Sequence, residues 1–205
     1  MKNKLFILAI SVLVLTSCSK KFEGIGDIIN KGKNTVAVTN EYIKYTILKG
    51  DQYSDKSNYA AVKYGELIFN VKFDSSAVYK TIKKENQKDI NKLFGFSDNK
   101  ADHHQFSARF GWRWSDNALR LFAYTYNNGT MSSKEMGEVQ IGKENLCSIK
   151  VAADKYLFTL NDSSIAMPRT ATTALAEGYQ LWPYFGGDES APHTISIWIK
   201  RLESN

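Results

Sequence analysis

The sequence has 205 residues and carries 27 lysines and arginines against 21 aspartates and glutamates, a formal net charge of +6. The basic residues are spread along the chain and form no recognisable nucleic-acid module, so we expect no nucleic acid partner. Two cysteines exclude a disulfide-rich scaffold and a cysteine-rich zinc site, and Cys147, within a strand-like run, is expected to be buried and unreactive. Aromatic residues make up 13% of the chain and no long helical period follows the N-terminal segment, which predicts one all-β domain.

The N-terminal segment has the pattern of an export signal. A positively charged start is followed by an apolar run, Leu5 to Leu15, which is too short to span a bilayer. The next residues, Leu15-Thr16-Ser17-Cys18, resemble the lipobox of bacterial lipoproteins, in which the cysteine becomes the lipidated first residue. We therefore expect a signal peptide at 1–17 and a lipidated Cys18 with a tether at 18–40. The anchor would lie in the cell envelope, at the outer membrane, with the periplasmic or surface side left open.

Residues 41–205 read as a single domain of short strands separated by turn residues. The expected strands cover Glu41–Leu48, Tyr59–Lys63, Glu66–Phe73, the central residues 106–114 and 119–126, and then 131–141, 146–152, 156–160, 178–185 and 193–200. A short helix is compatible with Lys80–Lys92. The number and spacing of the strands favour an all-β, two-sheet antiparallel sandwich or jelly roll.

The stretch from His104 to Gly129 is the centre of the predicted domain. Residues 106–114 and 119–126 both alternate with a period of two around the turn Ser115-Asp116-Asn117, as strands with one buried face do. One row of this hairpin is apolar, and the opposite row carries Arg109, Arg113, Arg120, Tyr124 and Tyr126. Guanidinium groups beside aromatic rings suit a polar or anionic ligand such as a glycan. The alternative is that these side chains are solvated or structural.

Two later segments add aromatic residues to this surface. Gln180, Trp182 and Tyr184 are expected on the outer face of 178–185, where Pro183 indicates an edge strand or a bulge. Trp198 is expected to point outward from the last strand. If the first and last strands lie beside the central hairpin, these residues extend its outer row. Alternatively, Trp182 and Trp198 pack against the second sheet or under a loop.

Three of these segments resemble concanavalin A-like jelly rolls. They are Lys92-Leu93-Phe94-Gly95-Phe96, Phe106-Ser107-Ala108-Arg109-Phe110-Gly111-Trp112-Arg113-Trp114 and Leu119-Arg120-Leu121-Phe122-Ala123-Tyr124-Thr125-Tyr126. They are most similar to polysaccharide lyases with a K-L-x-G-like segment followed by an S-A-R-x-x-W-R strand, although the family's K-L-P-G is changed here. Residues 147–151 and 156–161 are similar to paired strands of laminin G-like sandwiches. The resemblance covers most of the chain from about residue 41 and implies two curved sheets with a glycan groove on the concave one.

Three functions remain open at this point. The favoured one is a cell-envelope lipoprotein that binds a polysaccharide on the concave sheet. The second is a lyase that cleaves a uronate glycan by β-elimination, in which the arginines would neutralise the carboxylate, a histidine of His103-His104 would be the base and a tyrosine the acid. The foremost catalytic candidates are then His104, Tyr124 and Arg113. The third function is a structural lipoprotein that binds a protein partner.

Other chemistry has less support in the sequence. Hydrolases of the concanavalin type carry an E-x-D-x-E triad, and Glu135-Met136-Gly137-Glu138 has the wrong spacing for it. Adjacent His103 and His104 would point to opposite faces of a strand, so they are not expected to hold zinc together with Asp102. Asp188-Glu189 offers oxygen ligands for calcium without a recognisable loop spacing. We therefore expect no metal site and no cofactor.

Overall fold

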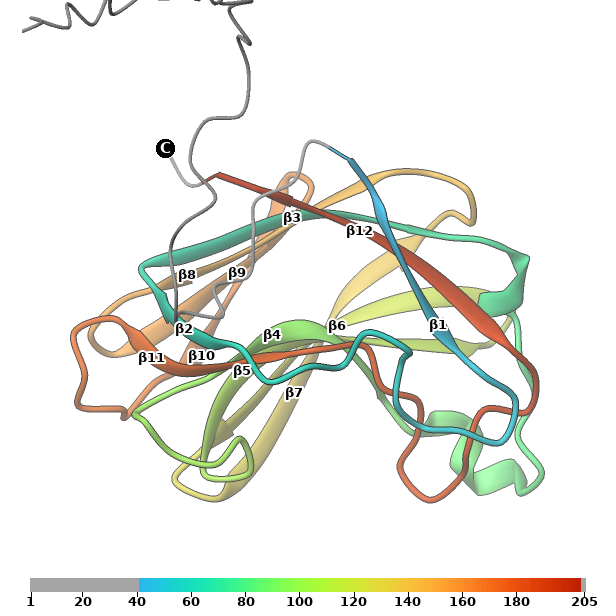
Figure 1. Ribbon diagram of the computed structural model, residues 1–205, viewed down its shortest axis with the longest axis horizontal. Coiled ribbons are helices and arrows are strands. Elements are labelled where there is room, and N and C mark those ends of the chain that lie inside the picture. Colours follow the sequence, from blue (N-terminus) through green and yellow to red (C-terminus); the bar gives the residue numbers. More distant parts are fainter. Residues whose placement is uncertain (1–40, 204–205) are drawn as a thin grey trace, which may run out of the picture. The chain divides into compact units, whose positions relative to one another are not determined.

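The computed structural model describes residues 41–203, and these form a sandwich of two antiparallel six-stranded sheets (Figure 1). The strand order is β1-β12-β3-β8-β9-β10 in the first sheet and β2-β11-β4-β5-β6-β7 in the second. This confirms the predicted all-β, two-sheet architecture. Within residues 41–203 no helix is long and apolar enough to cross a bilayer. The expected signal peptide and lipidated Cys18 lie outside the described residues.

The strands are short and are separated by turns. They are β1 (Ile43–Ile47), β2 (Ala61–Tyr64), β3 (Glu66–Phe73), β4 (Asn91–Ser97), β5 (Phe106–Ser115), β6 (Ala118–Asn127), β7 (Thr130–Val139), β8 (Asn145–Val151), β9 (Lys155–Leu160), β10 (Ser163–Pro168), β11 (Ala176–Leu181) and β12 (Ile195–Leu202). Two short 3₁₀ helices, η1 (Ser75–Ala77) and η2 (Lys84–Lys88), precede β4. The short helix compatible with Lys80–Lys92 is therefore the five-residue 3₁₀ helix η2, and β10 has no counterpart among the expected strands.

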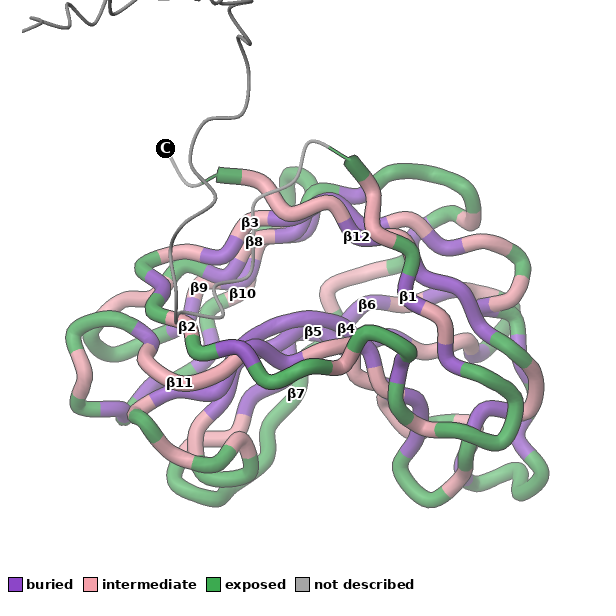
Figure 2. The backbone as a smooth tube through the Cα atoms, in the orientation of Figure 1, coloured by how far each residue is buried: buried purple, intermediate pink, exposed green. Residues whose placement is uncertain are grey.

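The core lies between the two sheets and is rich in aromatic rings, as the buried segments in Figure 2 indicate. Phe69 of β3 contacts Phe94 of β4 and Phe110 of β5, with ring centroids 5.1 and 5.6 Å apart. Trp112 is fully buried and packs on Phe73 across the sandwich. These apolar rows belong to the period-two pattern that predicted the strands, and their burial is the main stabilising contribution.

The expected central hairpin forms around the two-residue turn Asp116-Asn117, and its outer row faces away from the core. Arg109 pairs with Tyr124 and Arg113 with Arg120 between β5 and β6. A register shift in β4 places Lys92 opposite Gly111 and Gly95 opposite Arg109, so three steps along β4 match two along β5. This bulge brings Lys92 onto the same outer face as Arg109.

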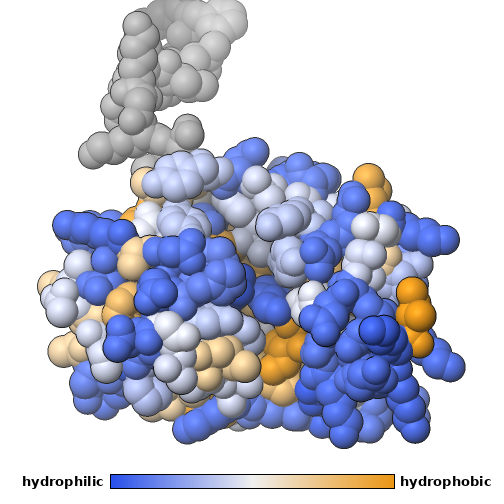
Figure 3. Space-filling view, turned by 90° about the horizontal axis from the view of Figure 1, so that it is seen from below, coloured by the Kyte–Doolittle hydropathy of each residue, from blue (hydrophilic) through white to orange (hydrophobic). Residues whose placement is uncertain are grey.

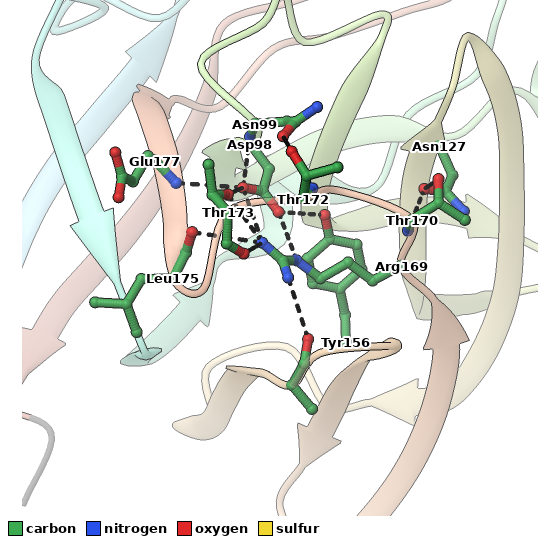
Figure 4. Close-up of polar contacts among 11 residues, drawn as sticks. Asp98, Asn99, Asn127, Tyr156, Arg169, Thr170, Thr172, Thr173, Leu175 and Glu177 are labelled. Atoms are coloured by element: carbon green, nitrogen blue, oxygen red, sulfur yellow. Dashed lines mark hydrogen bonds and ion pairs between the residues drawn. The ribbon is translucent and has the colours of Figure 1, made fainter.

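A buried ion pair joins the two sheets at one end of the sandwich (Figure 4). Asp98 directly follows β4 and Arg169 directly follows β10, and the Arg169 Nε lies 2.8 Å from the Asp98 Oδ2. The hydroxyl of Tyr156 donates to the same carboxylate at 2.6 Å, and Arg169 also donates to the Thr173 carbonyl. Both charged side chains are almost fully buried, and although burial opposes ionisation, the hydrogen bonds from Arg169 and Tyr156 keep the pKa of Asp98 below its usual value.

The first and last strands do not lie beside the central hairpin, which was one of the possibilities named above. Strands β1 and β12 pair with each other in the first sheet, so Trp198 lies opposite Lys44 on the outer face of the sheet that does not contain the hairpin. It therefore does not extend the hairpin's outer row. The segment 178–185 is interrupted at Pro183, which has no amide hydrogen, as the bulge alternative expects: β11 ends at Leu181, and pairing with β4 resumes where Tyr184 bridges Lys92.

Candidate functional site

A cavity of about 450 Å³ opens over the outer face of the second sheet. Its lining includes Lys92 of β4, Arg109 of β5, Tyr179 of β11 and Tyr184, together with Tyr53 and Tyr59 from the segment between β1 and β2. We call this cavity the tyrosine groove. Figure 3, which views the molecule from below Figure 1, shows a mostly hydrophilic face with a recessed apolar patch. A volume of this size is typical of a site for a small ligand or a few sugar units.

Arg109 is the cation at the base of the groove. Its side chain is only 6% exposed, and its Nε has no hydrogen-bond partner among residues 41–203. The guanidinium carbon lies 5.4 Å from the centre of the Tyr124 ring, and no carboxylate of the described chain forms an ion pair with it. Burial lowers the pKa of Arg109 to about 10. A buried cation without a paired anion is costly unless an anionic ligand binds there, so Arg109 indicates such a ligand.

Lys92 lies in the same groove. Its Nζ donates to the Gly186 carbonyl at 2.8 Å and lies 5.6 Å from the Tyr124 ring and 5.9 Å from the Tyr184 ring. Burial, together with the nearby charge of Arg109, lowers the pKa of Lys92 to about 8. Lys92 can therefore exchange a proton near neutral pH, whereas burial raises the pKa of Tyr124 to about 12 and keeps its phenol protonated.

His103 and His104 occupy the wall of the groove and differ in their surroundings. The Nδ1 of His103 lies 2.8 Å from the Tyr179 hydroxyl oxygen, which also accepts a hydrogen bond from the His103 backbone amide at 3.0 Å. Burial lowers the pKa of His103. The ring of His104 is more exposed and meets the Tyr126 ring edge to face at 5.1 Å.

Two tyrosines at the mouth of the groove are unusually exposed. Tyr53 and Tyr59 are 69% and 70% exposed, and their rings contact those of Tyr184 and Tyr179 at 4.9 and 5.8 Å. Backbone hydrogen bonds hold the segment that carries them, from the Phe185 amide to the Gln52 carbonyl and from the Gln180 amide to the Ala60 carbonyl. The tyrosines are therefore presented on an ordered segment as two aromatic platforms.

Two of the predicted arginines have partners elsewhere. Arg120 forms ion pairs with Glu135 at 2.6 Å and Glu138 at 2.8 Å, both on β7. Arg113 donates to the Lys88 carbonyl at 2.7 Å, and its guanidinium lies 4.7 Å from the Phe122 ring. Neither side chain lines the tyrosine groove. In the outer row of the hairpin, Arg109 therefore faces the groove, whereas Arg113 and Arg120 contact other parts of the protein.

The expectation that Gln180 and Trp182 lie on the outer face is wrong. Gln180 pairs with the core residue Phe96, is buried, accepts from the Tyr64 hydroxyl and donates to the Gly95 carbonyl. The Trp182 ring packs on Tyr45 of the first sheet and on Phe94, which is the alternative named above. Both residues border the groove, but their polar groups are already hydrogen-bonded, Trp182 to the Asn58 carbonyl.

The groove also contains residues that the sequence analysis did not select. Lys92 was noted only as part of a family-like segment, and the β4 bulge that turns it outward has no clear sequence signal. Tyr179 is not among the residues expected on the outer face of 178–185, although it lines the groove. Tyr53 and Tyr59 lie in and beside a polar stretch, so nothing in their local pattern connects them with the distant Arg109.

Comparison with known proteins identifies the fold. No protein-family model and no curated protein matches the sequence. Alginate lyase vAL-1 from Chlorella virus is 13% identical with a TM-score of 0.51, over 80% of this chain and 86% of that one. Alginate lyase AlyC3 is 10% identical with a TM-score of 0.55, over 80% and 74%. The catalytic domain of an endo-1,3-beta-glucanase from Thermotoga petrophila RKU-1 is 11% identical with a TM-score of 0.50, over 80% and 76%.

The chain has a concanavalin A-like sandwich. The similar structures are carbohydrate-active enzymes, and at these identities the similarity shows the shared fold. The expected fold is therefore confirmed. Any activity has to be argued from the side chains in the tyrosine groove.

Proposed function

We propose that this protein binds an acidic, uronate-containing polysaccharide in the tyrosine groove and cleaves it by β-elimination. The observation that carries the proposal is the buried Arg109, which lies beside Lys92 and Tyr124 in a groove lined with tyrosines. A uronate carboxylate supplies the anion that Arg109 requires, and tyrosine rings pack on the apolar faces of sugars. The structural similarity to two alginate lyases is consistent with this substrate class.

Each step of the elimination has a candidate group: Arg109 and Lys92 line the groove, and Tyr124 is buried next to Arg109. Arg109 neutralises the carboxylate, which makes the hydrogen on the adjacent C5 more acidic. Lys92 in its neutral form removes that proton, the electron pair forms a C4–C5 double bond, and the C4–O4 bond breaks. Tyr124, which lies beside both cations, delivers its proton to the departing oxygen. Solvent then returns Lys92 and Tyr124 to their starting protonation states.

A second candidate is binding of the same polysaccharide without cleavage. The two exposed platforms, Tyr53 and Tyr59, favour it because stacking surfaces at the mouth of a groove contribute to affinity whether or not a bond is broken. One screen separates the candidates. Affinity electrophoresis against neutral and uronate polysaccharides reports binding, and ultraviolet absorbance of the C4–C5 unsaturated uronate reports cleavage.

The proposal predicts retardation by uronate polysaccharides and rising absorbance on at least one of them. Retardation without absorbance identifies a non-catalytic binder. Retardation only by neutral polysaccharides, or by none of the panel, contradicts the assignment of a carboxylate to Arg109.

We further propose that the protein acts as a lipoprotein of the cell envelope. The support lies in the sequence, where the lipobox-like Leu15-Thr16-Ser17-Cys18 follows a short apolar run. An anchored enzyme or binder would hold its polysaccharide close to the membrane. Mass spectrometry of the N-terminal peptide tests this, because a diacylglyceryl group on Cys18 is expected and an unmodified Cys18 contradicts it.

The cleavage rate is expected to rise with pH through about 8. Lys92 acts as a base only when neutral, so below that pH the rate should rise about tenfold per pH unit and then level off. Initial rates at substrate concentrations below KM measure this. Lys92→Arg keeps the positive charge but cannot act as the base, and it should retain binding while losing cleavage. A wild-type rate that is constant across this pH range would show that Lys92 is not the base.

Tyr53 and Tyr59 are expected to contribute mainly to binding of long chains. Tyr53→Ala and Tyr59→Ala should each weaken polymer binding about 2- to 12-fold, which corresponds to ~0.5–1.5 kcal/mol of lost ring contact. Disaccharide binding should change little, since the rings lie at the mouth rather than beside Arg109. Trp198→Ala, on the opposite sheet, serves as the aromatic control. Equal losses for polymer and disaccharide would contradict a role as outer platforms.

A further inference from the structure

A compact cluster of potential metal ligands lies at the wall of the groove. It consists of Asp102, His103 and His104, whose ligand atoms all lie within 4.8 Å of one another. The Nδ1 of His103 lies 3.6 Å from one Asp102 oxygen, and the Nδ1 of His104 lies 3.5 Å from the other. The two imidazole rings lie face to face at a tilt, with centroids 4.1 Å apart.

This arrangement removes the objection that adjacent histidines point to opposite faces. That objection applies to a strand, whereas His103 and His104 lie in the turn before β5, which begins at Phe106. In the turn, both Nδ1 atoms face the same carboxylate. The His104 backbone amide donates to the Asp102 Oδ1 at 2.8 Å, and the Ser107 hydroxyl donates to the His103 carbonyl at 2.7 Å, so the turn is held in this shape.

We propose that Asp102, His103 and His104 form a binding site for a zinc-like divalent transition-metal ion. Metal–nitrogen and metal–oxygen distances near 2.1 Å place neighbouring ligand atoms of a tetrahedral site about 3.4 Å apart. With one ligand atom from each residue, the three atoms lie within 4.8 Å of one another, so small side-chain rotations bring them to this spacing. Two imidazoles and one carboxylate favour zinc, copper or nickel over calcium and magnesium, which take oxygen ligands. The fourth position is left for water or an oxygen of a bound molecule.

The site is distinct from Arg109 and Lys92 but adjoins the same groove, because both histidines line it. A metal ion on the Nδ1 of His103 replaces the contact of that atom with the Tyr179 hydroxyl. Metal binding is therefore expected to move the Tyr179 side chain, whose ring contacts the Tyr59 ring at the mouth of the groove. The inference does not depend on the proposed cleavage reaction.

Isothermal titration of the purified, untagged protein with zinc chloride tests this proposal. One zinc ion per chain is expected to bind, and Co²⁺ in its place should give the visible absorption of a four-coordinate site with nitrogen ligands. His104→Ala removes one ligand from an exposed position and leaves the packing of the core unchanged. Loss of a hydrogen-bond partner of a metal ligand lowers metal affinity by ~10–100-fold. Loss of the ligand His104 itself should lower the zinc affinity by more than this. Asp162→Asn, in the exposed turn between β9 and β10 of the first sheet and outside the groove, should bind zinc as the wild type does.

Any one of three results would overturn the proposal. The first is no saturable zinc binding to the wild-type protein. The second is binding to His104→Ala with the wild-type affinity, which would place the ion elsewhere. His103→Gln provides an independent second variant, and unchanged zinc affinity in it would also exclude this cluster. The melting temperature of each variant without metal confirms that the comparison is between folded proteins.

Discussion

Replacement of Arg109 by methionine should reduce the rate of polysaccharide cleavage by at least about 100-fold, the scale on which loss of one charge-stabilising group acts. Arg109 is the buried cation at the base of the groove and, in this account, neutralises the carboxylate of the substrate. Methionine has a similar length and keeps most of the packing. Since the guanidinium forms no ion pair within residues 41–203, its loss leaves no carboxylate of that segment unpaired, and the fold should persist.

The matched control for this prediction is Arg113→Met. Arg113 lies on the same face of β5 as Arg109. It contacts the Lys88 carbonyl and the Phe122 ring, outside the groove. Its replacement should leave cleavage and uronate binding close to the wild-type values. Initial rates and affinity electrophoresis are measured for both variants, along with their melting temperatures. Equal losses in the two variants, or full activity of Arg109→Met, would show that Arg109 does not hold the carboxylate.

Asp98→Asn is expected to destabilise the protein by about 3–5 kcal/mol, the effect of leaving one member of a buried ion pair without its partner. The carboxylate accepts hydrogen bonds from Arg169, Tyr156 and the Glu177 amide, and it lies where the two sheets are joined (Figure 4). Urea unfolding of the variant and the wild type measures the change. Because the pKa of Asp98 is lowered in the folded state, its stabilising contribution is present above the unfolded pKa and lost as the pH falls through the folded pKa.

Two further variants serve as controls for the effect of Asp98→Asn on stability. Lys63→Met breaks the solvent-screened ion pair with Glu177 and should change the free energy of unfolding much less than Asp98→Asn does. Asp98→Asn combined with Arg169→Met removes both buried charges and should cost less than the sum of the single variants. If Asp98→Asn had the same free energy of unfolding as the wild type, the ion pair would not contribute to the stability of the sandwich.

The central hairpin was predictable from the sequence because its information is local. Period-two alternation on both sides of Ser115-Asp116-Asn117 fixes the inner rows, and a short turn fixes the register. The structure has this hairpin, with Arg109 paired to Tyr124. The buried Cys147 was predictable for the same reason, since it lies in an alternating strand.

The rest of the site depends on contacts between residues far apart in the sequence. The bulge in β4 turns Lys92 outward. At the break around Pro183, Trp182 packs toward the core, whereas Tyr184 lies in the groove on the expected outer face, so uniform alternation misplaced Trp182 but not Tyr184. Arg120 has the same strand pattern as Arg109. Only the pairing of β6 with β7 brings Glu135 and Glu138 to it.

Mass spectrometry of the products from a defined uronate oligosaccharide distinguishes elimination from hydrolysis and from binding alone. Elimination by Arg109, Lys92 and Tyr124 gives fragments whose masses sum to that of the substrate, with the double bond at the new non-reducing end. Hydrolysis adds one water to that sum. The account predicts the unsaturated fragment with the wild-type protein and its loss in Arg109→Met. A hydrated product, or an intact substrate under conditions in which binding is observed, would contradict it.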